Sequence, residues 1–135
     1  MGILIDASVL IRHERGRLDL EKRLADRGEE GFFLSVVTAS ELLHGIYRAG
    51  DLAIRTKRSA FVEAVIARFP LLEVDLATAR VHAQIGAGLK MSGTLIGPND
   101  LWLAATCIAR GLSMATANVE EFNRVPGLRV EAWLS

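Results

Sequence analysis

The chain has 135 residues, of which half are hydrophobic, and its 16 basic and 16 acidic side chains leave no formal net charge. This length suits one domain with a sizeable core, so we expect a single domain over residues 1–135. The neutral balance argues against binding nucleic acid by bulk charge, although it allows a local basic patch around an acidic centre.

Short apolar runs alternate with amphipathic stretches from the N-terminus onward. Residues 3–5 predict a buried, parallel strand that ends at Asp6, with a turn into a helix after it. No membrane span is expected, because this apolar run stops at a charge. After an Arg-rich helical stretch, residues 32–37 predict a second strand. Thr38 and Glu41 then have the spacing of a capping box, which predicts a helix with Thr38 as its N-cap.

The same alternation continues to the C-terminus. Apolar spacing predicts a helix from Asp51 to Phe69, which Pro70 ends. The other expected elements are a strand at residues 71–74, a helix capped by Asp75, a strand at 112–116, a helical turn at 118–122 and an edge strand at 128–133. Strands that alternate with helices indicate an α/β domain with a mostly parallel sheet.

The stretch at residues 97–111 predicts a helix that is buried on nearly all sides, and such a helix belongs in the middle of a domain. We expect Asn99 as its N-cap and Gly111 as its left-handed C-terminal residue. Asp100 falls in the first turn, where the helix dipole favours a carboxylate. The only cysteine, Cys107, lies inside this helix without a disulfide partner, which favours a cytoplasmic protein.

Four oxygen-bearing side chains fall where a parallel sheet gathers the carboxyl ends of its strands: Asp6, Glu41, Asp100 and Asn118. Open α/β sheets bind ligands at this edge. Three carboxylates in a partly buried pocket need a positive charge to stay ionised. A donor set of oxygens, without His or Cys at metal spacing, favours Mg²⁺ or Mn²⁺ over zinc. The chemistry this predicts is metal-assisted hydrolysis of a phosphodiester.

Four segments resemble the successive signatures of PIN-domain ribonucleases, with the VapC-type toxins of toxin–antitoxin pairs most alike: residues 3–10 (ILIDASVL), 38–46 (TASELLHGI), 99–105 (NDLWLAA) and 115–128 (ATANVEEFNRVPGL). The resemblance covers the whole chain and implies a three-layer PIN-like fold and a metal-dependent endoribonuclease. It also implies an RNA substrate, an antitoxin protein as partner and a homodimer. The catalytic metal ligands that it implies are Asp6, Glu41 and Asp100.

The fourth position departs from the family pattern. Many relatives have Asp where this chain has Asn118, so we expect Asn118 to assist as a weaker metal ligand through its carbonyl or a bridging water. Glu120 or Glu121 could compensate, and on a short helical turn Glu121 is expected to lie nearer the pocket. Whether one or two metals bind stays open.

Simpler roles compete with several of these assignments. A capping role for Glu41 conflicts with metal binding, since a carboxylate folded back onto the Thr38 amide is not free. Ser8 and Thr116 could orient metal ligands, and helix capping explains Ser8 equally well. Six basic residues either position RNA phosphates around the acids or form solvated helix faces: Arg12, Arg15, Arg48, Lys57, Arg58 and Lys90.

Three other functions remain open at this point. One is a PIN nuclease of RNA maturation without an antitoxin. Another is a catalytically silent module that binds RNA or protein, with Asn118 as the trace of a lost site. The third is a phosphotransfer domain with Asp6 as nucleophile, which is disfavoured because position 8, where a second acid is needed, holds Ser8.

Overall fold

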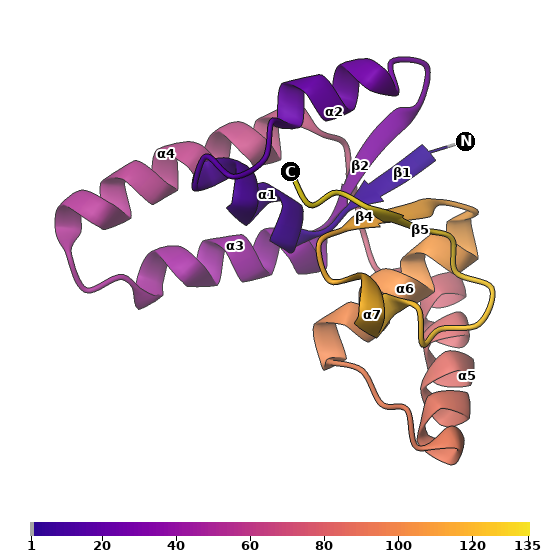
Figure 1. Ribbon diagram of the computed structural model, residues 1–135. Coiled ribbons are helices and arrows are strands. Elements are labelled where there is room, and N and C mark those ends of the chain that lie inside the picture. Colours follow the sequence, from indigo (N-terminus) through magenta and orange to yellow (C-terminus); the bar gives the residue numbers. More distant parts are fainter. Residues whose placement is uncertain (1) are drawn as a thin grey trace.

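The computed structural model describes residues 2–135 and shows an α/β fold (Figure 1). Its elements in chain order are β1 (Gly2–Ile5), α1 (Ala7–Glu14), α2 (Leu20–Asp26), β2 (Gly31–Ser35), α3 (Val36–Arg48), α4 (Leu52–Arg68), β3 (Leu71–Leu72), α5 (Leu76–Ser92), α6 (Pro98–Arg110), β4 (Ser113–Thr116), α7 (Val119–Phe122) and β5 (Val130–Ala132). The strands form one sheet in the order β3-β2-β1-β4-β5, and every pairing is parallel. Within these residues no helix has the length and apolarity that crossing a bilayer requires.

Helices cover both faces of the sheet, which confirms the expected three layers (Figure 1). Successive side chains of a strand point to opposite faces. Accordingly, Ile3 and Ile5 of β1 pack into a cluster with α1, α2, α3 and α4, whereas Leu4 packs into a second cluster with α5, α6 and α7. The paired helices α3 and α4 extend together beyond the sheet.

The predicted capping box is wrong. β2 ends at Ser35 and the chain enters α3 at the next residue, with the Ser35 hydroxyl accepting a hydrogen bond from the amide of Val37 at 3.0 Å. Thr38 therefore lies buried inside the first turn of α3 instead of capping it. Residues 36 and 37, expected at the end of the strand, are helical. Glu41 has no capping role, and the conflict with metal binding disappears.

Helix α6 is the buried central helix that the sequence predicts, since none of residues 100–109 is exposed. Its N-cap is Gly97 and not Asn99, which lies within the first turn. Pro98 occupies the first helical position, where a missing amide hydrogen is harmless. This start still leaves Asp100 in the first turn, with its carboxyl group at the edge where the strands end.

The other boundaries shift by a few residues. The expected strand at 71–74 is shorter, because only Leu71 and Leu72 pair with β2. Asp75 caps α5 as predicted, accepting a hydrogen bond from the amide of Thr78 at 2.8 Å.

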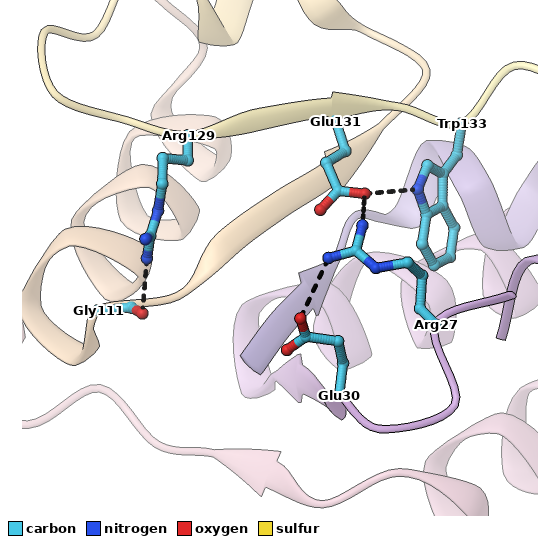
Figure 2. Close-up of polar contacts among 6 residues, drawn as sticks. All are labelled: Arg27, Glu30, Gly111, Arg129, Glu131 and Trp133. Atoms are coloured by element: carbon cyan, nitrogen blue, oxygen red, sulfur yellow. Dashed lines mark hydrogen bonds and ion pairs between the residues drawn. The ribbon is translucent and has the colours of Figure 1, made fainter. Parts of the chain in front are cut away.

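Side-chain contacts hold the edge strand β5 to both helical layers (Figure 2). Arg27, at the end of α2, contacts the carboxylate of Glu131 and also bonds Glu30 at 3.2 Å. On the other side, Arg129 donates to the carbonyl of Gly111 at 2.9 Å, where α6 ends. These contacts fix β5 beside β4, whose carboxyl end carries part of the candidate site.

Candidate metal centre

The structure brings Asp6, Glu41 and Asp100 together at the carboxyl edge of the sheet. Asp6 follows β1, Glu41 lies in α3 immediately after β2, and Asp100 lies in the first turn of α6. The charge of Asp6 raises the pKa of both other carboxyl groups, and Glu41 also raises that of Asp100. The three predicted acids therefore share one electrostatic environment, although 94 residues separate the first from the last (100 − 6).

Asp6 is held by two hydroxyl groups. The hydroxyls of Ser8 and Thr116 each donate to the Oδ2 atom of Asp6 at 2.7 Å. These hydroxyls in turn accept hydrogen bonds from the backbone amides of Ala117 and Asn118, at 3.0 and 2.8 Å. Burial raises the pKa of Asp6, and the two hydroxyls oppose that rise. Ser8 and Thr116 thus orient the Asp6 carboxylate, which is one of the roles expected from the sequence.

Replacing Thr116 with valine should raise the pKa of Asp6 further, because one donor to its carboxylate is lost. The amide of Asn118 also loses its acceptor, so the free energy of unfolding should fall by roughly 1–3 kcal/mol. Carbon-13 NMR titration and urea unfolding at neutral pH would measure the two effects.

Thr106→Val is the matched control for this substitution, since Thr106 is equally buried but bonds only the carbonyl of Trp102 in its own helix. It should leave the pKa of Asp6 unchanged. An unchanged pKa of Asp6 in Thr116→Val would contradict the role assigned to this hydroxyl.

Glu41 has an unsatisfied buried oxygen. Its Oε1 atom is buried and has no hydrogen-bond partner. Burial and the charge of Asp6 raise the pKa of Glu41, and a hydrogen bond with the Asn99 side chain works in the opposite direction. An unpaired buried carboxylate oxygen is costly unless a cation or a donor reaches it. Asn99, expected as a helix cap, instead belongs to the surroundings of Glu41.

Asp100 is the most perturbed of the acids. Burial, a hydrogen bond with Glu121 and the neighbouring carboxylates raise its pKa to about 8. A backbone bond from Gly97 and the same hydrogen bond lower the pKa of Glu121, so Asp100 and Glu121 titrate as a coupled pair that shares a proton at neutral pH. A carboxyl group that is protonated at neutral pH beside other acids is typical of a site that lacks its counter-charge.

Glu121 and Asn118 lie at the same edge, and Glu120 does not join them. The amide nitrogen of Asn118 donates to Oε2 of Glu121 at 2.6 Å. The backbone amide of Gly97, at the start of α6, donates to Oε1 of the same carboxylate. Glu120 is exposed on α7. The expectation that Glu121 lies nearer the pocket than Glu120 agrees with these contacts.

These acids offer oxygen donors and lack a neutralising positive charge, and both features suit a hard divalent cation. None of the dominant influences on the pKa values of Asp6, Glu41 and Asp100 is a basic side chain. Among residues 2–135, however, no three His, Cys, Asp or Glu side chains already stand as a metal-binding group.

A groove of about 540 Å³ opens beside the acids, between α1, α3 and α4. Glu41 and Asn99 line the end of the groove that adjoins the site, and three arginines line it as well: Arg15, Arg48 and Arg58. Arg58 lies 4.0 Å from Glu14, whereas Arg15 and Arg48 are exposed. Positive charge therefore flanks the acidic edge, which the neutral balance of the sequence allowed.

The fold and the site together define an α/β protein whose polar pocket lies at the carboxyl edge of a parallel sheet. Comparison with known families makes this more specific, since residues 3–128 match the PIN domain. The chain belongs to the PIN-domain family, which confirms the resemblance seen in its four sequence segments.

Several known proteins are similar over most of the chain. It is 35% identical over 130 residues to "Ribonuclease VapC1" of Rickettsia felis, covering 96% of this chain and 95% of that protein. It is 37% identical over 101 residues to "tRNA(fMet)-specific endonuclease VapC" of Salmonella typhimurium, covering 74% of each. A solved structure of VapBC-5 from Mycobacterium tuberculosis, described as a member of the VapBC family of toxin-antitoxin systems, has a TM-score of 0.75 at 31% identity and covers 99% of this chain and 98% of that one.

Proposed function

We propose that this protein is a metal-dependent endoribonuclease and the toxin of a toxin–antitoxin pair. The observation that carries the proposal is the convergence of Asp6, Glu41 and Asp100, whose pKa values are all raised, at one edge of the sheet. Relatives named as VapC ribonucleases, similar over 96% and 74% of the chain, support the reaction and the RNA substrate.

The cation proposed for this site is Mg²⁺ or Mn²⁺, with Asp6, Glu41 and Asp100 as its carboxylate ligands and Asn118 nearby. When bound, such a cation lowers the pKa of an attacking water and neutralises charge on the phosphate. The chain itself contributes a fixed Asp6 carboxylate, the unpaired Oε1 atom of Glu41, and Asp100 once its proton has left. Burial at this edge strengthens each of these electrostatic interactions.

The arginine-lined groove suits the approach of RNA. Arg15, Arg48 and Arg58 can contact backbone phosphates, which positions a strand without reading its sequence. A phosphate bound beside Glu41 would bring the neighbouring phosphodiester to the acids. The proposed track thus uses three of the six basic candidates and leaves out Arg12, whose side chain donates to the carbonyl of Leu134.

An antitoxin partner and a homodimer are part of the proposal. The similar M. tuberculosis protein belongs to a toxin-antitoxin system, which supports a partner of this kind. In this chain Tyr47, Leu52 and Ile54 are exposed to 73%, 78% and 49% near the turn between α3 and α4, where a protein partner would cover apolar surface. The buried, unpaired Cys107 suits the reducing cytoplasm that we propose as the location.

Cleavage of total RNA and of a tRNA panel by the purified chain tests this function. Discrete fragments should form with Mg²⁺ or Mn²⁺ and disappear with EDTA. Asp6→Asn should remove the activity at unchanged melting temperature, whereas Asp19→Asn, at an exposed cap of α2, should retain it. If folded wild-type protein cuts no RNA in either metal, the silent binding module becomes the better interpretation. Toxicity on expression, relieved by a co-encoded antitoxin, would separate a toxin from a nuclease of RNA maturation.

A further inference from the structure

Helix α3 contains a glycine, Gly45, that the packing of the chain does not require. Gly45 lies three residues before the last residue of the helix, and its φ is outside the left-handed region that favours glycine. A side-chain carbon built at this position would meet no atom within 4 Å. Glycine inside a helix lowers stability relative to alanine, because it loses more backbone freedom on folding. The reason for Gly45 therefore lies outside the fold itself.

The other glycines inside helices of residues 2–135 are Gly86 and Gly88, both in α5. A side-chain carbon on Gly86 would lie 3.3 Å from Cδ2 of Leu101, so the close packing of α5 against α6 accounts for this glycine. Gly88 has open space around it, as Gly45 has, but it is exposed and does not line the groove between α1, α3 and α4. Of the three glycines, only Gly45 faces that groove.

Gly45 lies midway along the wall that α3 contributes to the groove. Glu41, at the end that adjoins the acids, precedes it by about one turn, and Arg48 follows it by about one turn. Residues three or four apart lie on the same face of a helix. The bare backbone at Gly45 therefore separates the acidic end of this face from its basic end.

The contacts of Arg58 show that the backbone of Gly45 is accessible from across the groove. The Arg58 guanidinium donates from α4 to the Gly45 carbonyl at 3.5 Å and lies 4.0 Å from Glu14 of α1, so both contacts are long. In the described part of the chain, Arg15 and Arg48 form no ion pair. The positive charge of the groove is thus only weakly neutralised, which suits a polyanion such as RNA.

We propose that Gly45 is a substrate-contact residue: an RNA strand lies directly against its backbone, and the missing side chain leaves room for the sugar–phosphate chain. Phosphates on one side of this point contact Arg48 and Arg58, and the next phosphodiester on the other side reaches the acids. This inference rests on the proposed function and deepens it, since it names the point at which the substrate passes closest to the α3 backbone.

Binding of a short fluorescein-labelled single-stranded RNA, measured by anisotropy with Mg²⁺, tests this assignment. All variants are made in the Asp6→Asn background, so that the RNA stays intact. Gly45→Ala should weaken binding by roughly tenfold, because one added carbon in a filled contact has an effect of this order. Gly45→Leu should weaken it further. Gly88→Ala is the matched control, a helix glycine with open space outside the groove, and should bind RNA as the parent does.

The melting temperature separates steric exclusion from damage to the fold. Gly45→Ala and Gly88→Ala should each raise it by about 2–5 °C, because alanine favours the helix and neither added carbon meets an atom. Weaker RNA binding by a more stable protein cannot result from misfolding.

Three results would overturn the proposal. One is unchanged RNA binding in both Gly45→Ala and Gly45→Leu. A second is a lower melting temperature for Gly45→Ala, which would show that the fold itself needs this glycine. The third is unchanged RNA binding together with lost binding of a co-encoded protein, which would make the groove a protein-docking site instead.

The role of Gly45 and the proposed function fail in different ways. In cleavage assays without the Asp6→Asn substitution, Gly45→Ala should raise KM and change kcat little, because Gly45 lies outside the reacting groups. If the wild type cleaves RNA and Gly45→Ala does so with the same KM, the nuclease stands and only the role of Gly45 is wrong. If the folded wild type cuts no RNA but Gly45→Ala still weakens RNA binding, the groove binds RNA and the proposed reaction is wrong.

Discussion

Replacing Asp100 with asparagine should abolish RNA cleavage and, without metal, make the protein more stable near pH 8. Cleavage should fall at least about 100-fold, since a group that acts as part of a catalytic unit is removed. Stability should rise because an asparagine cannot carry the charge that Asp6, Glu41 and Glu121 disfavour at this position. Loss of activity together with a gain in stability separates a functional acid from a structural one.

The gain should depend on pH in a defined direction. The pKa of Asp100 is about 8 in the folded chain, against an ordinary value of 3.8. Between these values the folded protein holds a proton that the unfolded chain has lost. The free energy of unfolding of the wild type therefore falls as pH rises from about 4 to about 8. Asp100→Asn removes this contribution and should flatten the curve.

Thermal unfolding in EDTA at a series of pH values would measure this difference. Asp75→Asn is a suitable control, because the capping bond from the Thr78 amide lowers the pKa of Asp75, so its contribution to stability is constant above about pH 4 and is lost only in acid. Adding Mg²⁺ should raise the melting temperature of the wild type at pH 8 more than that of Asp100→Asn. Equal slopes for the wild type and Asp100→Asn would contradict the assigned pKa, and retained cleavage would exclude Asp100 from the reaction.

The positions of the main acids were predictable because local signals encode them. A strand that ends at Asp6, and a helix with Asp100 in its first turn, follow from short apolar runs and from Pro98. Parallel pairing then brings strand ends to one edge whatever the intervening sequence. The fold class and the meeting of Asp6, Glu41 and Asp100 therefore needed no knowledge of individual contacts.

The details that failed depend on contacts distant in sequence. Thr38 and Glu41 match a capping box, but β2 ends where Ser35 pairs with Leu72 of β3, and the helix begins at once. No pattern near Thr38 contains that information. Likewise, no local pattern near Asn118 shows that its side chain donates to Glu121, or that Glu121 also accepts from the amide of Gly97, which reaches the site from another helix.

Replacing Leu103 with alanine should cost about 2–5 kcal/mol in the free energy of unfolding. Leu103 is fully buried in α6 and packs in the cluster that includes Leu4 of β1 and Met114 of β4. Its loss leaves a cavity between the central helix and the two central strands. The free energy of unfolding of a domain is only roughly 5–15 kcal/mol, so Leu103→Ala loses a large part of it.

Urea unfolding compared with Leu95→Ala would measure this cost. Leu95 is 64% exposed in the loop before α6, and its truncation should change stability by less than about 0.5 kcal/mol. Similar midpoints for the two variants would contradict the central position assigned to α6.

The Leu103→Ala variant also links the hydrophobic core to the candidate metal centre. Because the acids already lower stability as the pH approaches 8, metal-free Leu103→Ala should unfold most readily there and recover in acid or with Mg²⁺. Helix α6 supplies both the core residue Leu103 and the site residue Asp100, about one turn apart. The packing of its buried face therefore holds in place a cluster of carboxylates that would otherwise separate.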